Sequence, residues 1–261
     1  MKILDTKNDK KYLIDKLKNN KIQNKILLLT HNPSDEELSY KNFIIKRCEE
    51  FDISYIDHEF DENVSASEMV KYINSFNEDD GFIIFLPFGD FEDMEYLRKN
   101  INIKDLDGFT YKSMGRSTSG QIDYLPATPK AVAKFLLNNY DLKSKNIVIA
   151  NNTNLIGLPL ATFLSKNHAT VTILNQHTTD DKEFIKNSDI FISAIGKGNY
   201  YDKSYFKDGQ VIIDVGTSYV NGKIIGDVDF NDLKDLDLEI LTSKNGIGSI
   251  TTLTLLESLI E

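Results

Sequence analysis

Short runs of apolar residues alternate along the chain with longer stretches in which apolar positions recur at helical spacing. The apolar runs predict buried strands at 25–30, 53–56, 81–87, 146–150, 169–174, 190–194 and 210–214. The stretches between and after them predict helices at 34–50, 65–76, 128–139, 156–166, 180–187 and 250–260. Short buried strands that alternate with helices are typical of parallel sheets covered by helices. The pattern therefore predicts an α/β fold.

Two of the predicted helices begin with residues that favour a cap. Ser65, with Glu68 three residues later, forms the pattern of a capping box. Thr128 followed by Pro129 predicts an N-cap and a first helical position, because proline is tolerated there. We expect the helix at 128–139 to lead from one sheet to the next.

Length and charge narrow the classes of protein. The chain has 261 residues, a formal net charge of -10 and a sequence pI of about 5.0. At roughly 100–200 residues per domain, this length predicts two domains. An acidic surface disfavours nucleic acid or an anionic membrane as the main partner.

Cys48 is the single cysteine, so no disulfide can form within the chain. We expect it to be a buried helix residue, although a lone cysteine can also be a nucleophile. No apolar run approaches the roughly 20 residues of a membrane span, and the charged first residues do not resemble a signal peptide. The histidines lack metal-site spacing. These features predict a cytoplasmic protein without a metal.

A polar turn after the strand at 146–150 is a candidate site for an anionic cofactor. Residues 151–159 join this strand to a helix, whose first N–H groups and positive dipole end would face a ligand. The usual glycine-rich dinucleotide fingerprint is absent, so an ordinary connection remains the alternative. Gly196 and Gly216 follow two later strands, where small residues let a cofactor approach the backbone.

Eight short blocks add a resemblance that no single motif carries. They include Pro126-Ala127-Thr128-Pro129 and the turn Gly157-x-Pro159, and the full set is 3–7, 104–109, 126–129, 157–159, 196–197, 211–216, 226–230 and 246–248. In this order they resemble blocks of the bifunctional methylenetetrahydrofolate dehydrogenase/cyclohydrolase family. Its members oxidise 5,10-methylenetetrahydrofolate with NADP⁺ and hydrolyse the methenyl product to 10-formyltetrahydrofolate.

The resemblance implies two α/β domains with a cleft between them. A folate-binding catalytic domain would comprise 1–127 plus 246–261, so that the C-terminal helix returns to the first domain. A Rossmann-like domain at 128–245 would bind NADP or NAD. Tetrahydrofolate would be the substrate, the small-molecule partners would be folate and dinucleotide, and the protein would form a homodimer.

Two polar residues of the family's catalytic site are replaced in this chain. Tyr40 matches the tyrosine of the family's helical Tyr-x-x-x-Lys motif, whereas the lysine position holds Ile44. The glutamine that orients this lysine corresponds to Phe85. Joint loss of both partners of one hydrogen bond indicates a consistent apolar replacement. Lys41 lies about 60° from Ile44 around the helix and is the candidate substitute amine, with a solvated surface lysine as the alternative.

Other site residues implied by the resemblance are kept or changed conservatively. Asp107 matches the family's folate-recognising aspartate, whose carboxylate can pair with the pterin's amino-pyrimidine edge, although Asp107-Gly108 is also a common turn. Asn151 replaces a glycine, and we expect it to tolerate a left-handed backbone. The cofactor-binding residues would be Asn151, Asn152, Thr153, Gln176, His177, Gly196 and Thr217. Because neither cationic position of the family holds arginine, a preference for NADP is in doubt.

We therefore predict a methylenetetrahydrofolate dehydrogenase in which Tyr40 stacks on the pterin and Asp107 anchors it. The cyclohydrolase step depends on the missing lysine. Two alternatives stay open from the residues alone. One is a catalytically silent paralogue that binds a ligand or a partner protein. The other is a different two-domain dehydrogenase, of the shikimate dehydrogenase type.

Overall fold

The computed structural model describes residues 1–88, 91–220, 223–244 and 246–260, and its chain forms two compact units. The four-stranded unit comprises Tyr12–Arg116 and Thr252–Glu261. The six-stranded unit comprises Met1–Lys11 and Ser117–Thr251. Each unit has its own parallel sheet, which confirms the predicted α/β class.

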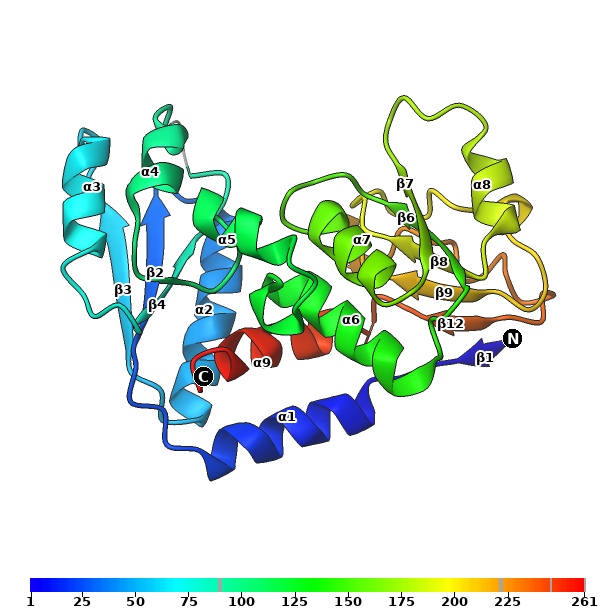
Figure 1. Ribbon diagram of the computed structural model, residues 1–261, viewed down its shortest axis with the longest axis horizontal. Coiled ribbons are helices and arrows are strands. Elements are labelled where there is room, and N and C mark those ends of the chain that lie inside the picture. Colours follow the sequence, from blue (N-terminus) through cyan, green and yellow to red (C-terminus); the bar gives the residue numbers. More distant parts are fainter. Residues whose placement is uncertain (89–90, 221–222, 245, 261) are drawn as a thin grey trace. The chain divides into compact units, whose positions relative to one another are not determined.

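The four-stranded unit has the strand order β3-β2-β4-β5, with all strands parallel (Figure 1). Its strands are β2 (Ile26–His31), β3 (Tyr55–Phe60), β4 (Gly81–Ile84) and β5 (Lys104–Asp105). Its helices are α1 (Lys7–Asn19, which begins in the other unit), α2 (Asp35–Glu50), α3 (Ala66–Ile73), α4 (Met94–Asn100), α5 (Tyr111–Ser117) and the end of α9 (Gly248–Glu257).

Side-chain alternation places different helices on the two faces of this sheet. Leu27 and Leu29 of β2 pack with residues of α3 and α4 in one buried cluster. Successive side chains of a strand point to opposite faces, so Asp57 of β3 points away from its neighbour Ile56, which packs on that cluster. Asp57 contacts α2. The sheet is therefore a middle layer with α2 on the other side.

The six-stranded unit has the strand order β1-β12-β9-β8-β6-β7, also parallel. Its strands are β1 (Lys2–Ile3), β6 (Asn146–Ala150), β7 (Thr170–Leu174), β8 (Ile190–Ser193), β9 (Val211–Asp214) and β12 (Glu239–Leu241), with a separate hairpin of β10 (Ser218–Val220) and β11 (Lys223–Ile225). Its helices are η1 (Ile122–Tyr124), α6 (Ala127–Asn139), α7 (Gly157–Lys166), α8 (Asp181–Asn187) and η2 (Lys203–Tyr205). Figure 1 shows α6 and α7 on one side of the sheet and α8 on the other.

The unit limits differ from the predicted domain limits at the start of the chain. β1 pairs with β12, with Lys2 opposite Glu239, so the first residues group with the six-stranded unit. At the other end, residues from Thr252 onward group with the four-stranded unit, so the C-terminal helix does return to the unit that holds most of the first half of the chain. The predicted limit at Asn245 lies outside the described residues.

One predicted helix start is confirmed and another is wrong. Ser65 caps α3, and its hydroxyl and Glu68 form the reciprocal bonds of a capping box. Thr128 is not a cap, because α6 begins at Ala127 and its first turn is closed by the N–H of Lys130 bonding to the carbonyl of Pro126. Proline after Thr128 costs no hydrogen bond there, since the first four N–H groups of a helix have no partner within it.

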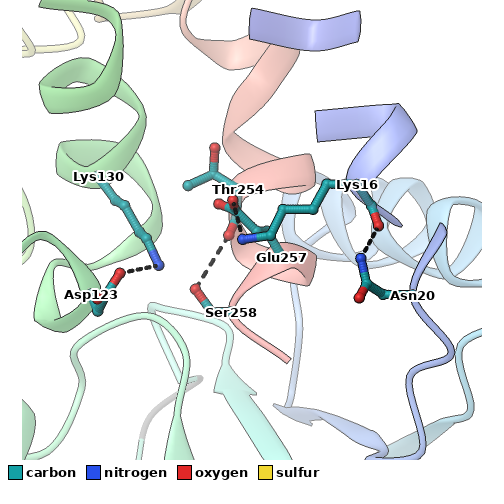
Figure 2. A network of polar contacts seen from close by, with 7 residues as sticks. All are labelled: Lys16, Asn20, Asp123, Lys130, Thr254, Glu257 and Ser258. Atoms are coloured by element: carbon teal, nitrogen blue, oxygen red, sulfur yellow. Dashed lines mark hydrogen bonds and ion pairs between the residues drawn. The ribbon is translucent and has the colours of Figure 1, made fainter. Parts of the chain in front are cut away.

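Ion pairs that each include one buried side chain link helices inside each unit (Figure 2). In the four-stranded unit, the amine of Lys16 on α1 lies 3.0 Å from a carboxylate oxygen of Glu257 on α9, which is buried. In the six-stranded unit, the buried Lys130 of α6 lies 3.7 Å from Asp123 of η1. The first contact joins α1 to α9, and the second joins α6 to η1.

The described residues lack two kinds of feature, a membrane-spanning helix and a cluster of metal-binding side chains. None of the helices there has the length and apolar character needed to cross a membrane. The described residues also contain no group of three or more histidine, cysteine, aspartate or glutamate side chains arranged to hold a metal ion.

Candidate functional site

Tyr40, where the resemblance places the catalytic motif, lies on α2 and packs against the residue that follows β4. Its ring is 5.8 Å from the Phe85 ring, at an interplanar angle of 75°. Ile44, one helical turn later, is completely buried, and Phe85 is also buried. The two apolar residues that the resemblance assigns to the lysine and glutamine positions thus lie in a packed environment, and the ring of Tyr40 contacts that of Phe85.

The hydroxyl of Tyr40 is held in a specific environment. Desolvation raises its pKa far above that of free tyrosine, the charge of Asp107 raises it further, and a hydrogen bond with the Thr252 side chain opposes both. The phenol is therefore protonated at neutral pH. Tyr40 as a whole remains 41% exposed, so a surface of the residue is open to a ligand. Thr252, on α9, was not found by the sequence analysis, because nothing in a helical threonine marks a partner about 200 residues away.

The loop that carries Asp107 is organised by a second carboxylate. Asp105 accepts hydrogen bonds from the backbone N–H groups of Asp107, Gly108 and Phe109 at 3.2, 2.9 and 3.1 Å. Its other oxygen accepts from the N–H and the hydroxyl of Thr110 at 2.7 and 2.8 Å. Gly108 has a φ of 75°, which side-chain-bearing residues rarely adopt. These bonds fix the backbone from which Asp107 projects toward Tyr40.

Lys41, the candidate substitute amine, is bonded to a neighbouring strand. Its Nζ lies 2.7 Å from Oδ1 of Asp57 on β3, and its side chain is 6% exposed. The solvated surface lysine considered from the sequence is therefore wrong for Lys41. Its bond to Asp57 directs the amine to β3, whereas Tyr40 contacts the residue that follows β4.

In the six-stranded unit, Asn151 organises the turn after β6 through its side chain. Its Oδ1 accepts hydrogen bonds from the N–H and hydroxyl of Thr153, at 2.9 and 2.8 Å, and from the N–H of Gly157 at 2.9 Å. Its Nδ2 donates to the carbonyl of Ala194 at 2.7 Å. The expected left-handed backbone is wrong, because Asn151 is not among the described residues with positive φ. Its carboxamide performs the ordering instead.

Gly157 is required where α7 begins. A Cβ added to this residue would lie 1.8 Å from the carbonyl oxygen of Asn151, far inside any permitted contact. The N–H of Gly157 meanwhile reaches the Asn151 side chain. The tight turn brings the start of α7 directly over the carboxyl end of β6, which is the arrangement that binds phosphates in dinucleotide folds.

A pocket of about 430 Å³ opens at the carboxyl ends of β6, β7 and β8. It is lined by Ala150, Asn151, Asn152, Leu174, Asn175, Gln176, His177, Thr178, Asp181, Ala194, Ile195, Lys197, Tyr200 and Tyr201. Four of the predicted cofactor residues are in this set, namely Asn151, Asn152, Gln176 and His177. Thr153 bonds to Asn151 beside it. Gly196, with a φ of 66°, lies next to the carbonyl of Thr217, since an added Cβ would be 3.7 Å from that oxygen.

Asp181, Lys197 and Tyr200 line this pocket and were missed by the sequence analysis. Lys197 stands directly after Gly196, so the position of that glycine at a strand end was the available signal. Tyr200 lies three residues further on, in a loop without periodicity. Asp181 is the first residue of α8, where an acidic residue is also explained by the helix dipole.

Two buried aspartates support the loops after β8 and β9. Asp227 accepts hydrogen bonds from the Ser193 hydroxyl and from the N–H groups of Ile195 and Lys197, at 2.6, 2.8 and 2.8 Å. Asp214 accepts from the N–H groups of Asp227 and Val228. Burial raises the pKa of Asp214 to about 7, hydrogen bonds from Val228 and Asp227 lower it, and the charge of Asp227 raises it again.

Comparison with known proteins decides between the interpretations. A family model described as the NAD(P)-binding domain of tetrahydrofolate dehydrogenase/cyclohydrolase matches residues 126–261. The chain belongs to the tetrahydrofolate dehydrogenase/cyclohydrolase family. The bifunctional protein FolD of Clostridium botulinum strain Okra is 33% identical over 265 residues, which cover 99% of this chain and 94% of the relative.

Two further family members support the same assignment. FolD of Clostridium perfringens strain 13 is 37% identical over 224 residues, covering 84% of this chain and 81% of the relative. The crystal structure of the bifunctional FolD of Campylobacter jejuni has a TM-score of 0.91 at 30% identity, over 100% of this chain and 97% of that one. Membership in this family sets aside the shikimate dehydrogenase type.

The family's dinucleotide fits the residues of the six-stranded unit. The pocket lies at the carboxyl ends of parallel strands, where open α/β sheets bind their ligands. Its volume is within the range of about 300–1,000 Å³ for small-molecule sites. The close approach at Gly157 and the exposed amides of Asn152 and Gln176 suit phosphate and ribose groups.

Proposed function

We propose that the chain oxidises 5,10-methylenetetrahydrofolate to 5,10-methenyltetrahydrofolate with NAD(P)⁺, and that it hydrolyses the methenyl product to 10-formyltetrahydrofolate poorly. The named relatives are bifunctional dehydrogenase/cyclohydrolases, which favours an enzyme over the silent paralogue. The observation that carries the proposal is that Asp107 lies close enough to Tyr40 for its charge to raise the pKa of the phenol. The other unit of the same chain has a pocket suited to a dinucleotide.

The pterin end of the substrate would be held by two groups. Asp107 would accept hydrogen bonds from the amino-pyrimidine edge as a charge-assisted pair. The exposed surface of Tyr40 would stack on the ring system. The bond to Thr252 and the packing against Phe85 fix the tyrosine before the substrate arrives, which limits the entropy lost on binding.

The dehydrogenase step asks mainly for positioning. NAD(P)⁺, when bound, supplies the hydride acceptor, while the protein holds the one-carbon bridge in reach of it. Neither Ile44 nor Phe85 has to exchange a proton for this step. The apolar replacement is therefore compatible with dehydrogenase activity.

The hydrolytic step asks for a group that activates water beside the cationic methenyl carbon. Ile44 and Phe85 offer neither donor nor acceptor side-chain atoms, and both are buried. Lys41 is paired with Asp57 on β3. Lys41 is therefore the candidate amine only for residual hydrolysis. We expect the methenyl product to accumulate.

We also propose a cytoplasmic homodimer, in line with the expectation from the resemblance. The net charge of -10 supports a protein that works away from anionic surfaces. Cys48 is buried, and burial raises the pKa of its thiol to about 12, which suits a structural cysteine and not a nucleophile.

The test is an assay of the purified chain with 5,10-methylenetetrahydrofolate and NAD⁺ or NADP⁺. Reduced nicotinamide, methenyl and 10-formyl products are each quantified by chromatography. We expect steady formation of reduced nicotinamide and methenyl product, with 10-formyl product at the rate of the uncatalysed reaction. Asp107→Asn should lower kcat/KM by about 30-fold or more, because a charged hydrogen-bond pair contributes roughly 2–3 kcal/mol.

Asp79→Asn is the matched control, since this exposed aspartate precedes β4 in the same unit. It should leave kcat/KM unchanged. Absence of turnover with both coenzymes, in folded protein beside an active relative, would contradict the dehydrogenase. Rapid enzymatic formation of 10-formyl product would contradict the loss of hydrolysis. A lower rate of that formation in Lys41→Met would then identify Lys41 as the amine that supports hydrolysis.

A further inference from the structure

We propose that the pocket of the six-stranded unit selects NAD⁺ against NADP⁺, and that the turn after β7 together with Asp181 makes the distinction. The inference rests on the proposed use of a nicotinamide coenzyme and adds which of the two is accepted. The two coenzymes differ only in a phosphate on the 2′-oxygen of one ribose. The question is therefore what the pocket offers to that oxygen.

The position of this ribose follows from the register of the sheet. Ala150 of β6 and Leu174 of β7 are register partners, so the turns that follow them start side by side. The turn after β6 leads to Gly157 and the start of α7, where the phosphates belong. In folds of this type the ribose 2′-oxygen is read by a residue roughly 20 positions further along, at the end of the neighbouring strand. Here that is the turn from Asn175 to Thr178.

Hydrogen bonds within this turn fix its backbone, and its side chains present uncharged amide groups. The N–H of Asn175 bonds to the Thr178 hydroxyl at 2.9 Å, and the N–H of His177 bonds to Oδ1 of Asn175 at 2.9 Å. Gln176 Nε2 lies 3.2 Å from His177 Nε2, and both side chains are exposed at the pocket. A ribose hydroxyl can both donate to and accept from such groups.

Charge in the pocket opposes an added phosphate at this wall. Asp181, at the start of α8, lines the pocket. Burial raises the pKa of Tyr201 and Tyr205, and the negative charge of Asp181 raises both further. A 2′-phosphate carries about -1.5 to -2 charges near pH 7, so it would meet a carboxylate of the same sign. The two hydroxyls of an unmodified ribose could instead donate to that carboxylate.

The one lysine or arginine among the described lining residues is on another wall. Lys197 follows β8, which lies on the opposite side of β6 from β7. Adjacent strands are about 4.8 Å apart, so the ends of β8 and β7 are separated by roughly 10 Å. The Lys197 amine lies over the Tyr200 ring, 5.5 Å from its centroid, and the backbone N–H of Lys197 donates to Asp227. Its contacts are thus made with the β8 side of the pocket.

Direct binding of NADH and NADPH to the full chain, without folate, tests the proposal. The fluorescence of each reduced coenzyme gives its Kd. We expect NADH to bind at least about 10-fold more tightly than NADPH at pH 8. His177→Arg should raise the affinity for NADPH relative to NADH by about 10-fold or more, because arginine pairs with phosphate in a bidentate manner. Asp181→Asn should shift the same ratio toward NADPH.

Ser165→Arg is the matched control, because it adds the same charge on an exposed position of α7 away from the lining residues. It should leave the ratio unchanged. Equal or tighter binding of NADPH by the unmodified chain would overturn the proposal.

The outcome is separable from that of the proposed function. Turnover with tight NADPH binding would keep the dehydrogenase and reject the coenzyme preference. NADH-selective binding without turnover would keep the coenzyme preference and reject the dehydrogenase. Failure to bind either coenzyme would reject the pocket as the coenzyme site.

Discussion

At the scale of single residues, Ile44 and Phe85 hold apolar side chains where the resemblance assigns a polar pair. Ile44 and Phe85 are both buried, and Phe85 supports the ring of Tyr40. A lone lysine or a lone glutamine in this place would leave a buried polar group without a partner, which costs about 1–3 kcal/mol. We therefore expect the two positions to be energetically coupled, so that a polar residue at one alone is poorly tolerated.

Restoring the polar pair gives a direct prediction. We expect Ile44→Lys alone to lower the free energy of unfolding by about 2–3 kcal/mol, because it places an amine in an apolar environment. Adding Phe85→Gln should recover part of that loss by supplying an acceptor for the amine. The double variant should also hydrolyse methenyltetrahydrofolate faster than the unmodified chain. Denaturant titration and product chromatography measure the two effects.

The matched control is Ile44→Met with Phe85→Leu, which keeps the pair apolar and should leave hydrolysis at the uncatalysed rate. Independent, additive effects of Ile44→Lys and Phe85→Gln on stability would contradict the coupling. A double variant that is folded and binds folate, yet hydrolyses no faster, would show that more than these two groups is missing.

Some of these residues could be read from the sequence and others could not. Tyr40, Ile44, Phe85 and Asp107 could be proposed because each matches a position in a short motif of the family. The partners Thr252 and Asp57 were not, because a contact between distant segments leaves no local pattern. Lys41 illustrates the consequence: helical geometry predicts its angle to Ile44, whereas its burial and its bond to β3 depend on the sheet packed beside it.

At the scale of elements, the turn between β6 and α7 depends on one carboxamide. Asn151 accepts from three groups of the turn and donates to the carbonyl that follows β8. Asparagine alone combines an acceptor and a donor in this size and shape, whereas aspartate only accepts when ionised. The side chain thereby joins the carboxyl ends of two neighbouring strands at the coenzyme pocket.

Substitutions at Asn151 should therefore affect the coenzyme and not the folate. We expect Asn151→Ala to raise KM for the preferred coenzyme by about 10-fold or more, since several hydrogen bonds of the turn are lost. Asn151→Asp should raise it further at low salt, because the new charge faces both the Ala194 carbonyl and the coenzyme phosphates. Added salt should reduce that second effect. KM for the folate should change by less than about 2-fold.

Asn154→Ala, in the same turn and exposed, serves as the control and should change neither KM. If Asn151→Ala bound coenzyme as the unmodified chain does, the turn would be held by its backbone and α7 alone. Steady-state kinetics at low and high salt, with melting temperatures for each variant, separate these outcomes.

The length of the pattern explains part of the accuracy of element prediction, although the 13-residue helix α1 was also not predicted. Long periodic stretches such as 34–50 and 156–166 gave helices close to α2 and α7, and the capping box at Ser65 was correct. β1 and β12 have two and three residues, too few for any periodicity, and were not predicted. Because β1 pairs with β12, this omission also displaced the start of the chain into the wrong unit.

At the scale of the whole molecule, two kinds of carboxylate oppose each other in the dependence of stability on pH. Glu68, Asp202 and Glu239 have pKa values lowered chiefly by hydrogen bonds from Ser65, Ser204 and Lys2, respectively. A lowered pKa in the folded state contributes stability that is lost as the pH falls through it. Asp214 acts in the opposite direction, since its pKa is raised by burial.

The direction in which Asp214 changes stability with pH follows from the protons that it binds in the folded and unfolded chain. Its pKa is 3.8 in the unfolded chain and about 7 in the folded one. Between these values the folded protein holds a proton that the unfolded chain has released, so the free energy of unfolding falls as the pH rises from about 4 to 7. At about 1.4 kcal/mol for each unit of difference, the loss amounts to roughly 4–5 kcal/mol at most. Stability should therefore be greatest on the acidic side of neutrality.

Asp214→Asn removes this titration while it keeps the shape of the side chain and one acceptor for the N–H of Asp227. We expect the variant to lose less stability than the unmodified chain between pH 5 and pH 8, so that the difference between the two proteins changes steadily in favour of the variant as the pH rises. Denaturant titrations at several pH values measure it, with the exposed Asp235→Asn as the control. Because both proteins share every other titrating group, their difference isolates Asp214. A difference that is constant across this range would mean that the carboxyl remains ionised when buried, held by its two N–H donors and not neutralised beside Asp227.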